Sequence, residues 1–257
     1  MIAPSLTLIH TLLLFGTAFI AGGLNAVAGG GSFITFPTLI FTGVPPIAAN
    51  ATNNTALWVA ALASAGAYRK DLGIPQRELL LLSATSLVGG LLGSLALLYT
   101  SPNVFQKLIP YLLLLATLVF TFGEPFKAWF GRQKSSPESP PLFNLMLAQG
   151  AIAIYGGFFG AGLGILMLAT LSFLGIKNIH AMNAFKTFLG SCINGIAIVP
   201  FVFAGVIAWP QAILMAVGSS LGGYLSAHYA RRLEARIIRR VVMVVAFSMT
   251  LYFFIHG

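Results

Sequence analysis

Long apolar runs, separated by short polar or Gly- and Pro-containing connections, fill the chain from end to end. Several runs reach the ~20 residues that an α-helix needs to cross a bilayer, whereas an outer-membrane barrel would show alternating strands of ~10 residues. The pattern predicts ten helical segments, at about 5–27, 33–41, 48–68, 77–99, 104–122, 142–159, 163–174, 180–204, 210–229 and 237–255. The second and seventh segments are short, so full crossings, re-entrant segments and half-helices all remain open for them.

Composition supports the same class. Hydrophobic residues make up 58 % of the chain and charged residues 7 %, against roughly 25 % charged residues in soluble domains. The formal net charge of +9 is concentrated in short connections between apolar runs, where basic residues set topology. We therefore predict an all-α polytopic protein of the cell (cytoplasmic) membrane, with the lipid bilayer and not nucleic acid as its partner.

Four motifs recur at a nearly constant spacing of 133 to 135 residues. They are Gly22-Gly23 with Gly156-Gly157, Asn50-Ala51 with Asn183-Ala184, Pro75-Gln76 with Pro210-Gln211, and Gly89-Gly90 with Gly222-Gly223. This spacing predicts an internal duplication of five segments. The expected domains are a first transmembrane repeat at 1–122, a hydrophilic cytoplasmic linker at 123–141 and a second transmembrane repeat at 142–257.

Charge then suggests how the repeats are oriented. Three basic residues lie at 69–77, and the equivalent connection at 205–209 has none. Five Arg lie at 231–240, and their equivalent at 100–106 has none. Because cationic connections stay on the cytoplasmic side, we expect inverted repeats with both termini outside. If the short segments do not cross, the repeats would be parallel instead.

A polar sequence, Asn50-Ala51-Thr52-Asn53-Asn54-Thr55, interrupts the third segment. Spacings of three and four place Asn50, Asn53 and Asn54 on one helical face. Amides facing lipid would cost several kcal/mol, so they face protein, water or substrate. Interhelical hydrogen bonds are one explanation; we favour contact with substrate, because three amides exceed what helix association needs.

The second half carries Asn183, Lys186, Thr187 and Asn194 on its equivalent segment, with Lys186 aligned to Asn53. An intramembrane ammonium indicates a functional site whose natural counterpart is an anion. A shallower Lys186 that extends to the interface is the alternative. His180 begins this segment and is a candidate for proton coupling, because the apolar segments contain no carboxylate in their interiors.

Gly-rich turns precede both polar motifs. Gly29, Gly30, Gly31 and Ser32 predict a helix break, which exposes N–H groups suited to an anion. The turn at 160–164, which includes Gly162, is explained equally well by a break or by close helix packing. For Gly89, Gly90, Gly93, Gly222 and Gly223 we expect close packing.

Groups for catalysis or metal binding are missing from the sequence. The five acidic residues lie in connections or at segment ends, no HExxH motif occurs, and Cys192 is the only cysteine. We therefore predict neither an enzyme nor a metal site, and no cofactor.

The order of these motifs resembles a known family. Gly29-Gly30-Gly31-Ser32, then Gly43-Val44-Pro45-Pro46 and Ala49-Asn50-Ala51-Thr52-Asn53, is similar to the TauE/SafE-type membrane permeases, described as sulfite or organosulfonate exporters. Asn183-Ala184-Phe185-Lys186 followed by Asn194 is similar to that family's second repeat. The resemblance covers nearly the whole chain and implies transport of small sulfur-containing anions such as sulfite or sulfoacetate.

The resulting hypothesis is a secondary transporter of small anions that works by alternating access around a site near mid-membrane. Its expected substrate-binding residues are Gly29, Gly30, Gly31, Ser32, Asn50, Asn53, Asn54, Thr55, Gly162, Asn183, Lys186, Thr187 and Asn194. An anion channel, or a membrane subunit that passes sulfur species to a partner enzyme, are the alternatives. A homo-oligomer remains open.

Overall fold

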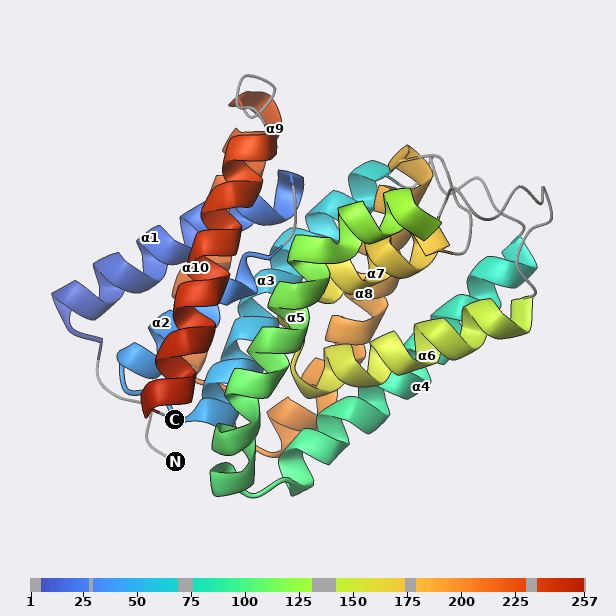
Figure 1. The fold of residues 1–257 in the computed structure, drawn as a ribbon. Coiled ribbons are helices and arrows are strands. Elements are labelled where there is room, and N and C mark those ends of the chain that lie inside the picture. Colours follow the sequence, from blue (N-terminus) through green and yellow to red (C-terminus); the bar gives the residue numbers. More distant parts are fainter. Residues whose placement is uncertain are drawn as a thin grey trace.

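The computed structural model describes residues 6–27, 30–68, 76–130, 142–173, 179–229 and 235–256. The described residues form ten α-helices and no strand (Figure 1), which confirms the predicted all-helical class. The helices are α1 (Leu8–Val27), α2 (Ser32–Phe41), α3 (Pro46–Tyr68), α4 (Gln76–Tyr99), α5 (Pro102–Phe130), α6 (Leu142–Phe158), α7 (Leu163–Phe173), α8 (Ile179–Phe203), α9 (Trp209–Tyr229) and α10 (Ala235–His256).

Four of these helices contain stretches long and apolar enough to cross a membrane, at Leu8–Asn25, Gln76–Tyr99, Pro102–Val119 and Ala184–Phe203. Shorter apolar helices accompany them, at Ser32–Phe41, Leu142–Phe158 and Val242–His256. The 10 residues of α2 and the 11 of α7 span only ~15–17 Å at 1.5 Å per residue. That is about half of a ~30 Å hydrocarbon core, and residues 174–178, which follow the described part of α7, lie outside the described residues.

The fifth helix extends further than the apolar pattern predicts. The fifth segment is expected to end at Phe122, whereas α5 continues to Phe130. This places the first eight residues of the predicted linker 123–141 in a helix, and residues 131–141 lie outside the described residues. The extension contains Lys127 and Ala128, both good helix formers, so the helix ends eight residues later than the apolar pattern predicts.

Two helix pairs approach closely through glycine. In the α1–α9 pair, a Cβ added at Gly22 would overlap the carbonyl oxygen of Ser219, and one added at Gly222 would overlap that of Phe19. In the α4–α6 pair, a Cβ at Gly157 would overlap the carbonyl of Gly90. Contacts of the same kind at Gly89 and Gly93 confirm the packing role expected for these residues.

The central pair is α3 and α8, which run in opposite directions (Figure 1). The start of α3 lies beside the connection that follows α8, because the N–H of Ala208 donates to Thr52 Oγ1 at 2.9 Å. Around this pair, α4 packs on α8 and α9 packs on α3. Helix α5 packs on both α7 and α10. α10 also packs on α2, where the rings of Phe41 and Tyr252 lie 5.1 Å apart.

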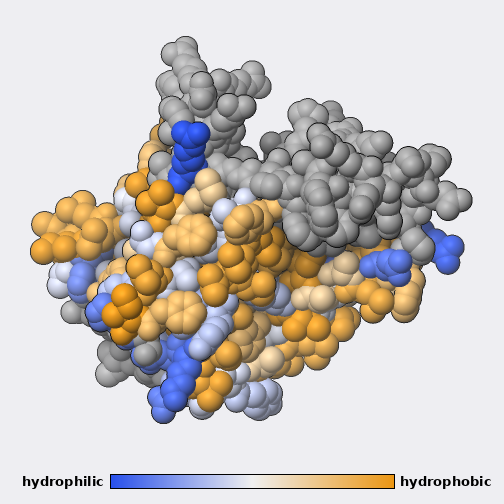
Figure 2. Space-filling view, viewed as in Figure 1, coloured by the Kyte–Doolittle hydropathy of each residue, from blue (hydrophilic) through white to orange (hydrophobic). Residues whose placement is uncertain are grey.

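The outer face is apolar. Figure 2 shows hydrophobic side chains spread over the face made by α5 and α10. Exposed residues on these helices include Tyr111, Leu115, Leu251, Phe254 and Ile255. Since lipid and not water surrounds a membrane-spanning bundle, apolar side chains are expected on this surface.

Candidate functional site

The polar sequence of α3 is buried inside the bundle. Asn50 is 2 % exposed, Asn53 3 % and Asn54 7 %. Thr55 is also buried, and its hydroxyl donates to the carbonyl of Ala51 one turn earlier in α3. The three amides therefore face protein and not lipid, as their spacing predicts.

Asn53 is held by the short helix α2. The Thr35 hydroxyl lies 2.6 Å from Asn53 Oδ1 and 3.1 Å from the carbonyl oxygen of Gly31. A hydroxyl has one proton to donate, so these two acceptors share it. Sequence reasoning did not identify Thr35; a hydroxyl in a short, apolar, Pro-containing segment was the available signal.

The first Gly turn is held by a side chain from α1. Gly30 has φ +89°, a left-handed conformation that favours glycine. The N–H of Gly31, at the start of α2, donates to Asn25 Oδ1 at 2.8 Å. Asn25 was missed, although an Asn late in an apolar run just before a Gly turn resembles a cap. Ser32 begins α2 and is half-buried, and Gly29 lies outside the described residues.

The second Gly turn is a break, and it lies beside the first half of the chain. Gly160 and Gly162 both have φ +74°, which decides between the two explanations for this turn. Asn50 Nδ2 donates to the carbonyl of Phe158 at 3.0 Å, at the end of α6. A Cβ added at Gly162 would lie 3.6 Å from Cζ of Phe33 in α2. The structure thus brings the start of α2 and the turn before α7 together.

Lys186 is buried in the first half of α8, with 8 % of its surface exposed. Its aliphatic chain lies on the start of α7: a Cβ added at Gly164 would be 3.2 Å from Lys186 Cδ and 3.5 Å from Cγ. No hydrogen bond or ion pair to Lys186 is found within the part of the chain that the structure describes. The low exposure shows that protein atoms cover most of the Lys186 side chain.

The α3–α8 contact itself is polar. Trp58 Nε1 donates to the carbonyl of Ser191 at 3.0 Å, and the indole lies against Gly195. Two amide oxygens in this region, Oδ1 of Asn54 and of Asn194, are buried without a hydrogen-bond partner among the described residues. Buried polar atoms without partners are uncommon and call for an explanation such as a ligand. Trp58 was not among the predicted residues.

The expected site residues fall into two groups on opposite sides of the α3–α8 crossing. Asn53 lies five residues before Trp58, and Lys186 five residues before Ser191, on helices that run in opposite directions. At 1.5 Å per residue, their Cα atoms are separated by roughly 15 Å along the helix axes. The Thr187 hydroxyl donates within α8, to Ala184. The side chains of His180 and Asn183 lie outside the described residues.

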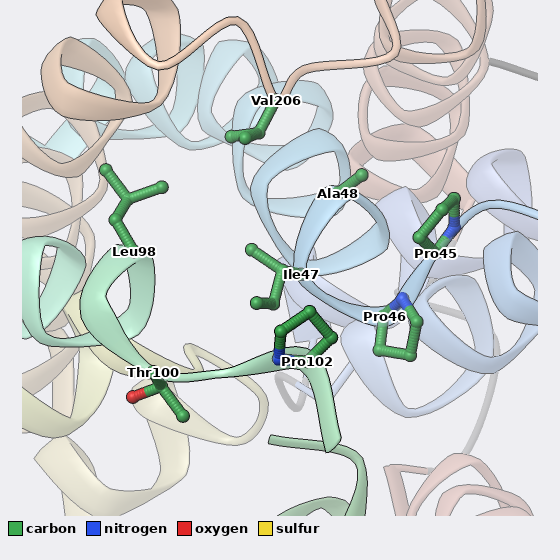
Figure 3. Close-up of a pocket in the computed structure, with 8 residues that line it drawn as sticks. All are labelled: Pro45, Pro46, Ile47, Ala48, Leu98, Thr100, Pro102 and Val206. Carbon is green, nitrogen blue, oxygen red and sulfur yellow. The ribbon is translucent and has the colours of Figure 1, made fainter. Parts of the chain in front are cut away.

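A separate apolar cavity lies where several helix ends meet. Its volume is about 220 Å³, and its lining comes from the start of α3, the α4–α5 connection and the α8–α9 connection. Figure 3 shows the lining residues Pro45, Pro46, Ile47, Ala48, Leu98, Thr100, Pro102 and Val206. None is a predicted binding residue, but Ala48 lies two residues before Asn50. Because it is lined by the start of α3 and the connection after α8, the cavity lies on the same side of the α3–α8 crossing as Asn53.

Comparisons with known proteins cover nearly the whole chain. The family described as "Sulfite exporter TauE/SafE" matches residues 14–253. A "Probable membrane transporter protein" of Haemophilus influenzae is 30 % identical, covering 93 % of this chain and 92 % of the relative. The "Probable membrane transporter protein ORF9" of a Sinorhizobium species is 29 % identical over 93 % and 90 % of the two chains.

A third relative, "Probable membrane transporter protein YfcA" of Escherichia coli strain K12, is 27 % identical over 96 % of this chain and 91 % of its own. No solved structure gives a significant match. Within the described residues, no group of His, Cys, Asp and Glu side chains could hold a metal ion.

Proposed function

The chain belongs to the sulfite exporter TauE/SafE family, and on that premise we propose that it is a secondary transporter of small sulfur-containing anions, of the sulfite or organosulfonate class. As a member of this family it is a multi-pass membrane transporter and not an enzyme. The finer parts of the proposal concern the substrate, the binding residues and the alternating-access mechanism.

The observation that carries the proposal is the environment of Lys186. An ammonium buried in an apolar helix is costly unless a counter-charge or a water-filled path accompanies it. Lys186 has neither a carboxylate nor a hydrogen-bond partner among the described residues, and its chain packs on the first turn of α7. The positive end of a helix favours negative charge. An anion bound at this point would satisfy both Lys186 and the start of α7.

Inverted repeats supply the framework for alternating access. Residues at the predicted repeat spacing of 133 contact each other directly: Thr117 Oγ1 and Thr250 Oγ1 are 3.4 Å apart, and Trp58 bonds to Ser191. The same spacing relates α1 to α6 and α4 to α9. The α1–α9 pair therefore corresponds to the α6–α4 pair, and both are closely packed. Antiparallel α3 and α8 are the arrangement expected of two halves related by a two-fold axis in the membrane plane.

In this mechanism the two groups of polar residues face opposite sides of the membrane. The Asn50 and Asn53 group lies on the same side of the α3–α8 crossing as the apolar cavity, and the Lys186 group lies beyond the crossing. Asn54 and Asn194 would interact with the anion as it passes between the groups, because rotation of an amide presents its NH₂ donors. Rocking of one half against the other would expose each group in turn.

The test is sulfite flux into proteoliposomes. We expect Lys186→Gln to lower the rate at least tenfold, because it removes the buried charge with little change in length. The matched control is Lys107→Gln, which removes an exposed lysine from α5 and should leave the rate unchanged. Wild-type vesicles that show no sulfite or sulfonate flux, or equal rates for Lys186→Gln and the wild type, would overturn the proposal.

A further inference from the structure

The unusual feature of the binding region is its charge. Among the described residues, Lys186 is the only buried Lys, Arg, Asp or Glu. Other basic side chains that the structure describes, Arg77, Lys107 and Arg240, are exposed. Within the described residues, the electrostatics of the interior therefore depend on one ammonium and on the ends of helices.

The repeat supplies no second charge. The position equivalent to Lys186 in the first half is Asn53, a neutral amide whose Oδ1 already lies 2.6 Å from the Thr35 hydroxyl. The two halves thus differ where a symmetric site would carry two cations. Two ammonium groups would match a dianion, whereas this chain has one in its described interior.

The start of α7 adds only a fraction of a charge. Helix N-termini carry roughly half an elementary charge, and Lys186 lies against Gly164, the second residue of α7. Part of this turn is already used, since the N–H groups of Leu163 and Leu166 donate to the carbonyls of Gly160 and Gly162. The positive charge that the described residues offer a ligand is therefore between one and about one and a half.

From this geometry we infer that the site selects monovalent anions: a sulfonate, hydrogensulfite or another oxyanion with one negative charge is accepted, and a divalent oxyanion of the same size is rejected. A monoanion balances Lys186 and the α7 turn. A dianion would bring a second, uncompensated charge into an apolar interior, where unpaired charge is expensive. This inference rests on the proposed function and adds to it a charge rule, namely that monovalent anions are accepted and divalent anions are rejected.

The experiment compares methanesulfonate with sulfate. Both are tetrahedral and of similar size, and they differ in that a methyl group replaces one oxygen and removes one charge. Each is tested as a competitor of sulfite uptake in proteoliposomes, and as a ligand that raises the unfolding temperature of the purified protein. For the wild type we expect the half-inhibitory concentration of methanesulfonate to be at least tenfold lower than that of sulfate.

Variants connect the preference to Lys186. Lys186→Arg retains the charge and should retain the tenfold preference, whereas Lys186→Gln should reduce the preference to within about twofold in the unfolding assay, which does not need flux. Lys107→Gln should behave as the wild type.

Equal or stronger competition by sulfate in the wild type, or an unchanged preference in Lys186→Gln, would overturn the charge rule. If sulfite flux persists in that case, the proposed function stands. A wild type without any sulfite or sulfonate flux would instead remove the proposed function itself.

Discussion

Trp58 of α3 and Ser191 of α8 are joined by a hydrogen bond in which the indole Nε1 donates to the backbone carbonyl at 3.0 Å. The two residues are 133 positions apart, which equals the spacing of the predicted repeat. Gly195, one turn beyond Ser191, leaves the space that the indole occupies. This contact lies at the crossing of α3 and α8, so any movement of one half against the other must change it.

Trp58→Phe should alter transport more than stability. The substitution keeps an aromatic ring and removes one hydrogen bond, whose net contribution is about 1 kcal/mol. If the halves rock about this crossing, loss of the bond changes the balance between the two access states and therefore the sulfite flux. We expect at least a threefold change in rate with a small drop in unfolding temperature. Unchanged flux would place the moving contact elsewhere.

Gly195→Ala should test the same contact from α8. A Cβ at this position would lie 3.0 Å from Trp58 Nε1 and 3.2 Å from two ring carbons, so the indole or α8 must shift. We expect reduced flux in the single variant and partial recovery when Trp58→Phe is added, because the smaller ring frees space. Double-mutant additivity, measured as flux, would show that the two sites are independent.

Thr35→Val should impair the first polar group. Valine has nearly the same shape as threonine but no hydroxyl, so Asn53 Oδ1 and the carbonyl of Gly31 lose their shared donor. A buried acceptor left without a donor costs about 1–3 kcal/mol. We expect lower flux and a lower unfolding temperature, with both restored in Thr35→Ser. Failure of serine to restore them would mean that the methyl group, and not the hydroxyl, matters.

Asn54→Leu separates a structural role from a substrate role. Asn54 Oδ1 is buried with no hydrogen-bond partner within the described residues. Replacing such a group by an apolar side chain of similar size is neutral or stabilising if the amide only packs. We expect an unfolding temperature equal to or above that of the wild type, together with at least tenfold lower sulfite flux. A stable variant with full flux would remove Asn54 from the pathway.

The helices could be predicted from the sequence because apolar runs and Gly or Pro punctuation are local signals. The predicted start of the third segment, at residue 48, differs by two residues from Pro46 in α3. The burial of Asn50, Asn53 and Lys186 also followed from the cost of polar groups in lipid. Hydrogen-bond partners on other helices could not be predicted in this way. Nothing in the sequence near Thr35, Asn25 or Trp58 specifies which helix each side chain will contact.

The relation between Asn53 and Lys186 shows that aligning the two halves of the chain does not predict which residues lie close together. The predicted repeat spacing makes them equivalent positions, and in the proposed inverted arrangement equivalent residues lie on opposite sides of the axis that relates the halves. Equivalence in a repeat therefore does not by itself imply that two residues lie close together. Only the antiparallel packing of α3 and α8, with Trp58 on Ser191, separates the two groups.

Gly22→Ala should disrupt the α1–α9 pair, and Gly16→Ala is its matched control in the same helix. A Cβ at Gly22 would overlap the carbonyl oxygen of Ser219, a backbone atom that cannot rotate away, whereas one at Gly16 meets nothing within 4 Å. Alanine in a helix gains roughly 0.5–1 kcal/mol over glycine. We therefore expect Gly16→Ala to raise the unfolding temperature slightly and Gly22→Ala to lower it by many degrees in detergent. Similar temperatures for the two variants would mean that α1 and α9 are not in close backbone contact.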